Sequence, residues 1–290
     1  MGDVELERLA RRGRYLVMKT VHDSGAGHIG GPLSAMDMLI ALYFRVLRVR
    51  PEQPDWDDRD RFVLSKGHSA VALYTVLALR GYLPVAELAT FDKGDSRLQG
   101  HPDMTRLPGV EASTGSLGQG LSFGMGVALA ARRRGLGLHT FVMLGDGEIQ
   151  EGMIWEAAHA ARRHGLGNLT AILDYNGLQQ YGWPQGADAG GKGDRRDPWA
   201  GFDPAAMFAA FGWNPVEVDG HDSDAFIGAC EDARTEAGGQ LPTAIIAHTA
   251  KGHGLSFTEG NYLWHARVPN DDELERARVE LGIDEGGMPR

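Results

Sequence analysis

A chain of 290 residues, 42% of them hydrophobic, can bury a full core as one large domain or two small ones. Its formal net charge of −10 argues against nucleic acid or an anionic membrane as a partner. The single cysteine, Cys230, excludes a disulfide framework and a cysteine-based zinc cluster, and it fits a reducing compartment. The N-terminal segment is too charged for a signal peptide, and no apolar run approaches the ~18 residues of a membrane span. We therefore expect a soluble, cytoplasmic α/β protein.

The N-terminal part of the chain combines two helical patterns with a glycine-rich loop. Residues 5–22 carry apolar side chains on one side, which predicts a helix. A second helix is expected over residues 35–47, with Ser34 as its N-cap and Asp37 at its third position. The loop between them, SGAGHIGGP, exposes its backbone and lets His28 lie near a ligand. Without further context, a lone loop histidine is more often a surface residue.

Three more loops lie before the middle of the chain. A short strand at 61–64 is followed by Ser65-Lys66-Gly67-His68-Ser69 and a helix over 70–79, so Lys66 and His68 lie at a helix start. The loop at 94–102 ends in Gly100-His101-Pro102. The segment STGSLGQG at 113–120 leads into a helix over 121–133. Its spacing matches neither a P-loop nor a dinucleotide fingerprint.

One βαβ unit is predicted over residues 141–181. The apolar runs 141–144 and 169–173 predict strands, and the spacing of residues 149–163 predicts a helix between them. The first strand ends in Gly-Asp-Gly at 145–147, and the second ends in Asp-Tyr-Asn-Gly at 174–177. In a right-handed crossover both ends open on one edge of a parallel sheet, where ligands bind. We therefore expect Asp146 and Asn176 to lie side by side.

This pair of turns favours a site for a divalent cation and an anion. Two hard oxygen ligands suit Mg²⁺ or Ca²⁺. A helix starting just after Gly147 would point free N–H groups at the same place, and Gly147 lacks a Cβ that would obstruct an anion. Either turn alone is more often a plain end to a strand. The two turns together, at the ends of strands that one helix connects, indicate a metal-bound diphosphate site.

The remaining chain continues the alternation of helices and strands. Residues 183–200 are glycine-rich and charged, and we expect them to be mobile. Helices are predicted over 205–211, 223–236 and 271–281, and strands over 215–218 and 241–248. The last strand runs into Thr-Ala-Lys-Gly-His-Gly at 249–254, and Trp264-His265 follows. These loops supply further candidate ligands at the same sheet edge.

The separated motifs together resemble a known family. The GDG turn followed about thirty residues later by an asparagine turn resembles the thiamine diphosphate fingerprint, and GDGEIQEGMIWEA and DYNGLQQYG are most similar to its transketolase version. The glycine–histidine loops, GSLGQG and the Lys-Gly-x-Gly loop before Trp-His also resemble transketolase segments, in the same order over about residues 25–270. Ile29 departs from the family's Gly-His-Pro-Gly. The resemblance implies a three-layer α/β/α fold with a mostly parallel sheet, as a single thiamine-diphosphate-binding domain over residues 1–290.

The resemblance also implies roles for individual residues. The metal ligands would be the side chains of Asp146 and Asn176 and the carbonyl of Leu178. The cofactor contacts would be Lys66, His68, Gly147 and Lys251 at the diphosphate, and Gly115 and Leu117 along the rings. The sugar would face His28, His101 and His265. Glu151 matches the residue that meets the activating glutamate of the pyrimidine-binding domain. Glu156 is either a second support for that contact or an ordinary helix carboxylate.

The implied activity is that of half an enzyme. A transketolase is a transferase that moves a two-carbon ketol unit from a ketose (phosphate) donor to an aldose acceptor with thiamine diphosphate and Mg²⁺ or Ca²⁺. The pyrimidine-binding and C-terminal domains are expected on a separate chain, in a heterotetramer of two copies of each. Met153, Ile154 and Trp155 are expected to form apolar surface for that partner. The alternatives are a deoxyxylulose-phosphate synthase-like or 2-oxo acid dehydrogenase-like component, or a non-catalytic binding protein; a nicotinamide dehydrogenase lacks its glycine pattern.

Overall fold

The computed structural model describes residues 2–180 and 203–289, and it is built around one parallel sheet. The strands are β1 (Arg61–Leu64), β2 (Thr140–Gly145), β3 (Leu169–Tyr175), β4 (Asn214–Asp219) and β5 (Thr243–His248). Their order in the sheet is β1-β2-β3-β5-β4, and every neighbouring pair is parallel. The segment 183–200, for which the sequence suggested mobility, lies outside the described residues.

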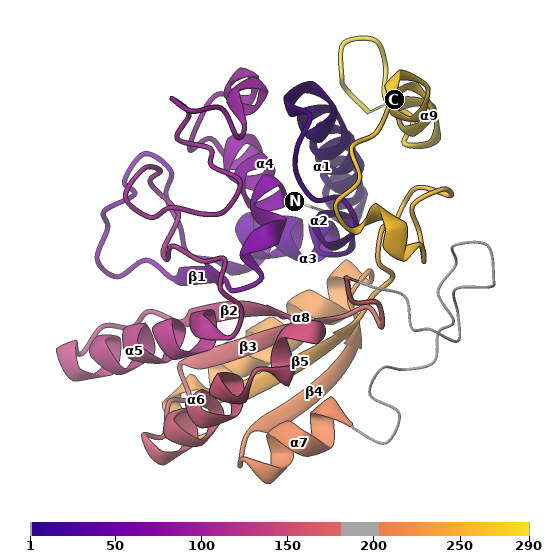
Figure 1. The fold of residues 1–290 in the computed structure, drawn as a ribbon. Helices are drawn as coiled ribbons and strands as arrows, with labels where there is room; N and C mark the ends of the chain where they lie inside the picture. Colours follow the sequence, from indigo (N-terminus) through magenta and orange to yellow (C-terminus); the bar gives the residue numbers. More distant parts are fainter. Residues whose placement is uncertain (1, 181–202, 290) are drawn as a thin grey trace.

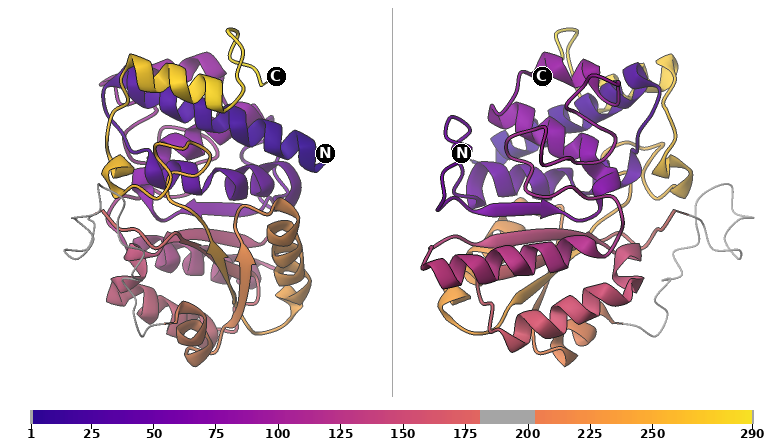
Figure 2. Two further views of the ribbon diagram at one scale, coloured as in Figure 1. Left: turned by 90° about the vertical axis from the view of Figure 1, so that its right-hand side faces the viewer. Right: turned by 60° about the vertical axis from the view of Figure 1, so that its left-hand side comes forward.

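Helices cover both faces of this sheet (Figures 1 and 2). On one face lie α1 (Asp3–Ser24), α3 (Met36–Ala41), α4 (Ala70–Arg80) and α8 (Ser223–Thr235). On the other lie α5 (Gln119–Arg134), α6 (Gly152–Arg163) and α7 (Pro204–Ala210). The short α2 (Gly30–Ser34) precedes α3, and α9 (Asp271–Glu280) packs against α1. Short stretches of 3-10 helix occur at Gly67–Ser69, Val85–Thr90, Gly147–Gln150, Glu236–Gly238 and Tyr262–His265, and Leu42–Val46 is π-helical. The predicted three-layer α/β/α fold is confirmed.

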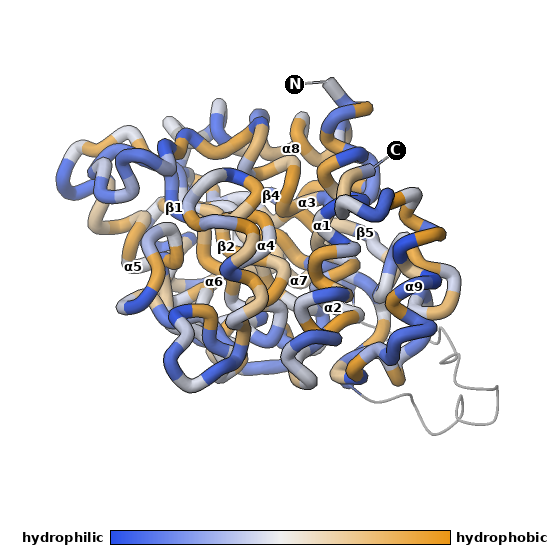
Figure 3. The backbone as a smooth tube through the Cα atoms, turned by 90° about the horizontal axis from the view of Figure 1, so that it is seen from above, coloured by the Kyte–Doolittle hydropathy of each residue, from blue (hydrophilic) through white to orange (hydrophobic). Residues whose placement is uncertain are grey.

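Alternation along the strands divides the interior into two cores. In β2, Phe141 and Met143 face the α1/α3/α4 side, whereas Val142 and Leu144 face the α5/α6 side. Both sets are buried, because a central parallel strand has a helix layer on each face. Each fully buried apolar side chain stabilises the fold by about 1.5–3 kcal/mol. Figure 3 shows that hydrophobic residues gather at the middle of the molecule, around β2 and α4.

Two predicted helices differ from the structure. The helix expected over 35–47 begins earlier, because Gly30–Ser34 is already helical, and it ends in the π-helical turn. Ser34 is therefore no N-cap, and its hydroxyl donates instead to Asp174 at 2.6 Å, with the Gly31 carbonyl also within reach at 3.0 Å. The helix expected from Ile149 begins at Gly152, after a 3-10 turn that starts at Gly147. The sequence suggested that the free N–H groups of this helix begin just after Gly147. In the structure they begin at Gly152 instead.

The other predicted elements lie within a few residues of their expected bounds. In the part of the chain that the structure describes, no helix combines the length and the apolar character needed to cross a membrane. The loops that follow β1, β2, β3 and β5 meet at the edge of the sheet where these strands have their carboxyl ends. This edge is where ligands bind in parallel α/β sheets.

Candidate functional site

A cavity of about 520 Å³ opens at this carboxyl edge of the sheet. Loops after α1, β1, β2, β3 and β5 line it, together with the loop before α5. The predicted residues in its lining are His28, Lys66, His68, Gly115, Leu117, Asp146, Gly147, Glu151, Asn176, Leu178, Lys251 and His265. His101 and Glu156 are predicted residues outside the lining. Residues far apart in sequence thus meet at one place, as the βαβ argument required.

The two polar turns after β2 and β3 are tied together. Gly145 and Asp174 are partners in the register of the two strands. The carboxylate of Asp146 accepts one hydrogen bond from the Gly147 N–H and one from the Gly177 N–H, both at 2.7 Å. The Asn176 side-chain oxygen accepts from the Leu178 N–H at 3.1 Å. The prediction that Asp146 and Asn176 lie side by side is confirmed.

The donor set of these turns fits a divalent cation. Asp146 is 4% exposed, and burial raises its pKa to about 6 although Lys251 acts in the opposite direction. Its two accepted hydrogen bonds leave lone pairs unused at the cavity wall. A cation stabilises the negative charge of a buried carboxylate. The carboxylate, amide and carbonyl oxygens here are also the ligand types that Mg²⁺ and Ca²⁺ prefer. The residues present therefore fit the metal that the sequence implied.

Lys251 holds the chain that follows Asn176. Its ammonium group donates to the carbonyls of Leu178 and Gln179, both at 2.9 Å, and lies 3.0 Å from Nδ1 of His265. Burial lowers the pKa of Lys251 to about 8, against the opposing effect of Asp146. The Leu178 carbonyl, the expected third metal ligand, thus already accepts one hydrogen bond. A carbonyl oxygen has two lone pairs, so a second is left for a metal.

Lys66 belongs to a buried network at the cavity wall. Its ammonium group donates to Asp174 and to the Gly31 carbonyl, the latter at 3.1 Å. Asp174 also accepts from the hydroxyls of Ser34 and Thr249. Burial acts to raise the pKa of Asp174, but Lys66 and the hydroxyl donors outweigh burial and lower it. Asp174 was not among the residues predicted from the sequence, and the diphosphate contact expected of Lys66 stays a prediction, although its ammonium group is already paired with Asp174.

Glu148 is a second residue that the sequence analysis missed. Its buried carboxylate accepts from the hydroxyl of Ser65, from the Gly118 N–H at 2.9 Å and from the Gly145 N–H at 3.1 Å. It thereby ties the GSLGQG loop to the ends of β1 and β2. Close packing at Gly120 completes the junction, since a Cβ there would lie 2.3 Å from Oγ of Ser65. The only sequence signal was an acidic residue directly after the GDG turn.

Three of the four predicted histidines form one cluster in the cavity wall. Ring centroids of His28, His68 and His265 are each 5.2 Å apart, and that of His101 lies 6.4 Å from His28 at the rim. Burial, assisted by nearby cationic groups, lowers the pKa of His28 to about 4 and that of His265 to about 3. The same causes hold the pKa of His68 well below its ordinary value. All three are neutral near pH 7, so each ring can donate one hydrogen bond and accept another.

The start of α6 differs in part from the expected partner surface. Glu151 lines the mouth of the cavity, and Glu156 is exposed on the helix beyond it. Ile154 is buried, and Trp155 packs on the rings of Phe208 and Phe211. The expectation that Ile154 and Trp155 face a partner is wrong, because Ile154 is buried in this chain's own core and Phe208 of α7, with Phe211 after it, packs on the Trp155 ring. Met153, 38% exposed, remains available.

Fold and site together define a class of protein. A parallel α/β sheet with the Asp146–Asn176 pair, a buried ammonium group and neutral histidines at its carboxyl edge is suited to a metal-bound anionic cofactor. Residues 6–287 match the family described as transketolase, thiamine diphosphate binding domain. The chain belongs to this family, and the resemblance predicted from the motifs is confirmed.

Relatives of known name agree with this assignment. The chain is 39% identical to a subunit of the 6-deoxy-6-sulfo-D-fructose transketolase of Clostridium sp. (strain MSTE9), and the match covers 96% of each chain. It is also 39% identical to one of the subunits of the apulose-4-phosphate transketolase of Phocaeicola vulgatus, over 95% of this chain and 93% of that one. The solved transketolase of Campylobacter jejuni superposes with a TM-score of 0.87 at 31% identity. The chain spans 44% of that protein's length.

Proposed function

We propose that this chain is the N-terminal subunit of a two-component transketolase. It would transfer a two-carbon ketol unit from a ketose donor to an aldose acceptor. The observation that carries the proposal is the cavity in which the Asp146–Asn176 pair faces the cluster of neutral histidines. The Clostridium and Phocaeicola relatives are named as transketolase subunits and match this chain over nearly their whole length. That match in length supports the two-component arrangement.

In this proposal the turns after β2 and β3 hold the cofactor's metal-bound end. Asp146, Asn176 and the Leu178 carbonyl would bind Mg²⁺ or Ca²⁺, and Lys251 would be the ammonium group nearest to a diphosphate. Lys66 would act by fixing Asp174 at the end of β3. Thiamine diphosphate, when bound, supplies the electron sink that stabilises a carbanion. Gly115 and Leu117 line the wall where its rings would lie.

The histidines would handle the sugar. A neutral imidazole can donate to one hydroxyl and accept from another, so it can orient a polyol and move a proton between its oxygens. His28 and His265 are held neutral by burial and lie in the wall, and His101 lies at the rim beside Gly115. The depressed pKa values of His28 and His265 keep both rings uncharged, which suits hydrogen bonding to sugar hydroxyls more than attraction of an anionic group.

The site is proposed to be completed by a second polypeptide with a pyrimidine-binding domain, in an assembly of two copies of each chain. Leu117, Phe123 and Met153 are large apolar side chains that are 36–39% exposed. They lie at the cavity wall, on α5 and on the adjoining α6. Glu151 lies at the same mouth, where it could meet a carboxyl group of the partner and share a proton with it. Glu156, exposed further along α6, would support that contact from the interface and not from the cavity.

Mixing the two chains tests the proposal. The isolated chain should bind thiamine diphosphate with Mg²⁺ in a calorimetric titration but show no ketol transfer. Adding the chain that carries the pyrimidine-binding domain should restore transfer, with a stoichiometric end point near one to one. Full activity of the isolated chain would overturn the two-component assignment. Cleavage of a 2-oxo acid or synthesis of a deoxyxylulose phosphate by the mixture would favour the other thiamine enzymes, and cofactor binding without turnover would favour a non-catalytic binding protein.

A further inference from the structure

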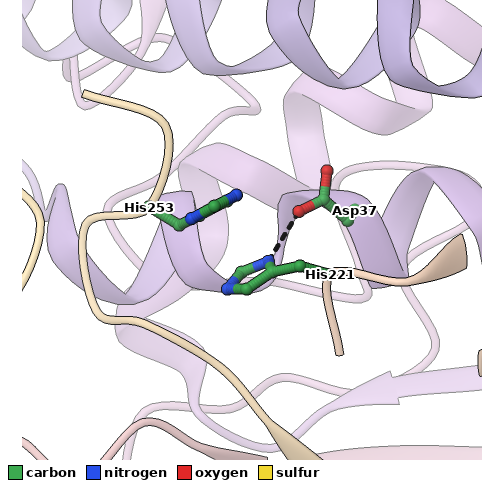
Figure 4. A group of neighbouring side chains, drawn as sticks. All are labelled: Asp37, His221 and His253. Carbon is green, nitrogen blue, oxygen red and sulfur yellow. Dashed lines mark hydrogen bonds and ion pairs between the residues drawn. The ribbon is translucent and has the colours of Figure 1, made fainter. Parts of the chain in front are cut away.

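A second polar cluster lies outside the lining of the cavity. It consists of Asp37 on α3, His221 in the turn between β4 and α8, and His253 in the loop after β5. Figure 4 shows the two imidazole rings face to face, with the Asp37 carboxylate beside His221. The ring centroids are 3.6 Å apart and the rings are inclined by 22°. Three segments far apart in sequence thus converge, and one of them is the loop that carries Lys251.

The hydrogen bonds of His221 determine which of its nitrogens carries the proton. Its Nε2 accepts from the Ala250 N–H at 2.9 Å, so that nitrogen is unprotonated. Its Nδ1 therefore donates to the Asp37 carboxylate, 2.7 Å away. Burial acts to raise the pKa of Asp37, but Arg14 and His221 outweigh it and lower the pKa to about 2, so Asp37 is ionised at neutral pH. Both ring nitrogens of His221 are engaged.

The backbone group that His221 holds is next to a residue of the cavity. Ala250 immediately precedes Lys251, whose ammonium group holds the carbonyls of Leu178 and Gln179. On the other side of Lys251, the Gly252 N–H donates to the Gly30 carbonyl at 3.0 Å. The backbone of Lys251 is thus fixed from both sides. On its N-terminal side the Asp37–His221 pair holds the Ala250 N–H, and Thr249 before it donates its own N–H to the Tyr175 carbonyl at 3.1 Å.

A metal ion is the obvious alternative occupant of this cluster, since candidate ligand atoms of Asp37, His221 and His253 lie within 4.8 Å of one another. The contacts argue against it. Arg14 donates to the same carboxylate oxygen of Asp37 that His221 uses, and its positive charge would repel a cation. Binding through His221 would also sacrifice its bond to Asp37 or to Ala250. The cluster is better satisfied as a hydrogen-bond relay.

We propose that Asp37 and His221 form a positioning pair that holds the Lys251 loop in its binding conformation. The inference deepens the proposed function, on which it rests. The pair touches neither cofactor nor substrate, and it acts through the Ala250 N–H on the placement of the Lys251 ammonium group. His253, stacked on His221 and bonded through Nδ1 to Glu259 at 3.0 Å, covers the outer face of the imidazole.

Two amide substitutions at one position separate the two bonds of His221. In His221→Asn the amide lies where Nδ1 is, so the bond to Asp37 can be kept while Ala250 loses its acceptor. In His221→Gln the longer side chain carries an acceptor to the Nε2 position and can restore the bond to Ala250. His164→Phe, at an exposed histidine after α6, is a control for the loss of an imidazole elsewhere.

Two measurements follow each variant: hydrogen exchange of the Ala250 amide in the unliganded chain, and calorimetric titration with thiamine diphosphate and Mg²⁺. His221→Asn should speed exchange at Ala250 and weaken cofactor binding, each by about ten-fold, which corresponds to the loss of one hydrogen bond to a partly buried donor. His221→Gln should keep both values within about three-fold of the wild type. His164→Phe should change neither. Should His221→Asn fail to fold, His221→Phe replaces it with the same expectations and keeps the stack on His253.

Three results would overturn the inference. In one, exchange and affinity stay at their wild-type values in folded His221→Asn and His221→Phe. In another, glutamine proves as damaging as asparagine. In the third, Zn²⁺ alone binds stoichiometrically in a manner lost in both His221→Phe and His253→Phe, which would make the cluster a metal site. If the wild-type chain does not bind thiamine diphosphate at all, the proposed function fails, and the exchange measurement still tests the hydrogen bond itself.

Discussion

Glu148→Gln is the substitution that best tests how the cavity is built. The Glu148 carboxylate accepts three hydrogen bonds and donates none, because its partners are the Ser65 hydroxyl and the N–H groups of Gly118 and Gly145. An amide replaces one acceptor oxygen with an NH₂ group, so one of the two N–H groups must face a donor. Leaving a buried donor unpaired costs about 1–3 kcal/mol.

A second effect partly offsets this loss. Burial raises the pKa of Glu148 above its ordinary value, so the ionised form is penalised by desolvation at neutral pH, and glutamine carries no such charge. We expect a net loss of about 1–2 kcal/mol in the free energy of unfolding for Glu148→Gln. Glu148→Ala orphans both N–H groups and should lose about 2–4 kcal/mol, since water entering the enlarged cavity hydrates part of them.

Urea unfolding followed by circular dichroism at pH 7 measures both losses, and Glu151→Gln, exposed at the cavity mouth, is the matched control. Because Glu148 holds the GSLGQG loop, exchange at the Gly118 amide should accelerate in both variants, and thiamine diphosphate should bind more weakly. If both variants unfolded within about 0.5 kcal/mol of the wild type, Glu148 would not be the acceptor that ties this loop to the sheet.

Three further predictions concern the site and the core. Asp146→Ala should weaken Mg²⁺-dependent binding of thiamine diphosphate by about 100-fold and Asn176→Ala by about ten-fold, because only the first removes a charged ligand; unchanged affinity in both would remove the metal assignment. His101→Ala should lower turnover of the ketose donor by about 100-fold and leave the affinity for the cofactor nearly intact. His68→Ala should instead raise the apparent dissociation constant of the cofactor by about ten-fold. Equal effects of both variants on one of these parameters would contradict this division of roles. Burial, aided by Arg234, lowers the pKa of His139 to about 3. Below pH ~6.5 the unfolded chain therefore binds a proton at His139 that the folded chain excludes. The free energy of unfolding is thus highest above that pH and decreases as the pH falls. His139→Leu should therefore lose about 3 kcal/mol less stability than the wild type between pH 7 and pH 4, and parallel pH profiles would refute the reasoning.

The sequence alone was sufficient for the parallel sheet and for the pair of ligand turns. The apolar runs that became β2 and β3 are short, continuous and bounded by glycine turns, so their strand character is visible locally. The position of Asp146 beside Asn176 then follows from the handedness of one βαβ unit, which is nearly invariant. The same local reasoning placed His28 and His68 in glycine loops, and the resemblance to transketolases assigned those loops to the site.

Local patterns failed where a distant partner decides the conformation. The helix expected to begin at Ile149 begins at Gly152 instead, after a turn in which Glu148 reaches back to the Gly145 N–H and across to Ser65 and Gly118. Ile154 and Trp155 suggest a free apolar surface on α6 in the sequence, yet Ile154 is buried in the core and Phe208 of α7, which follows only after residue 203, packs on the Trp155 ring. Neither the late start of α6 nor the burial of its apolar residues can be seen in the hydrophobic periodicity of the helix.

The polar networks were decided by the tertiary structure alone. Lys66 and Asp174 are 108 residues apart in the chain, and Asp37 and His221 are 184 apart. A sequence shows that such residues can ionise, but it does not show which of them lose their water. Burial makes an unpaired charge costly and a paired one tolerable, so the pairing partner and the pKa are set by the packing around each group. That is why turn chemistry and strand periodicity could be predicted for this protein, whereas the residues that hold its candidate ligands in place became visible only in the folded chain.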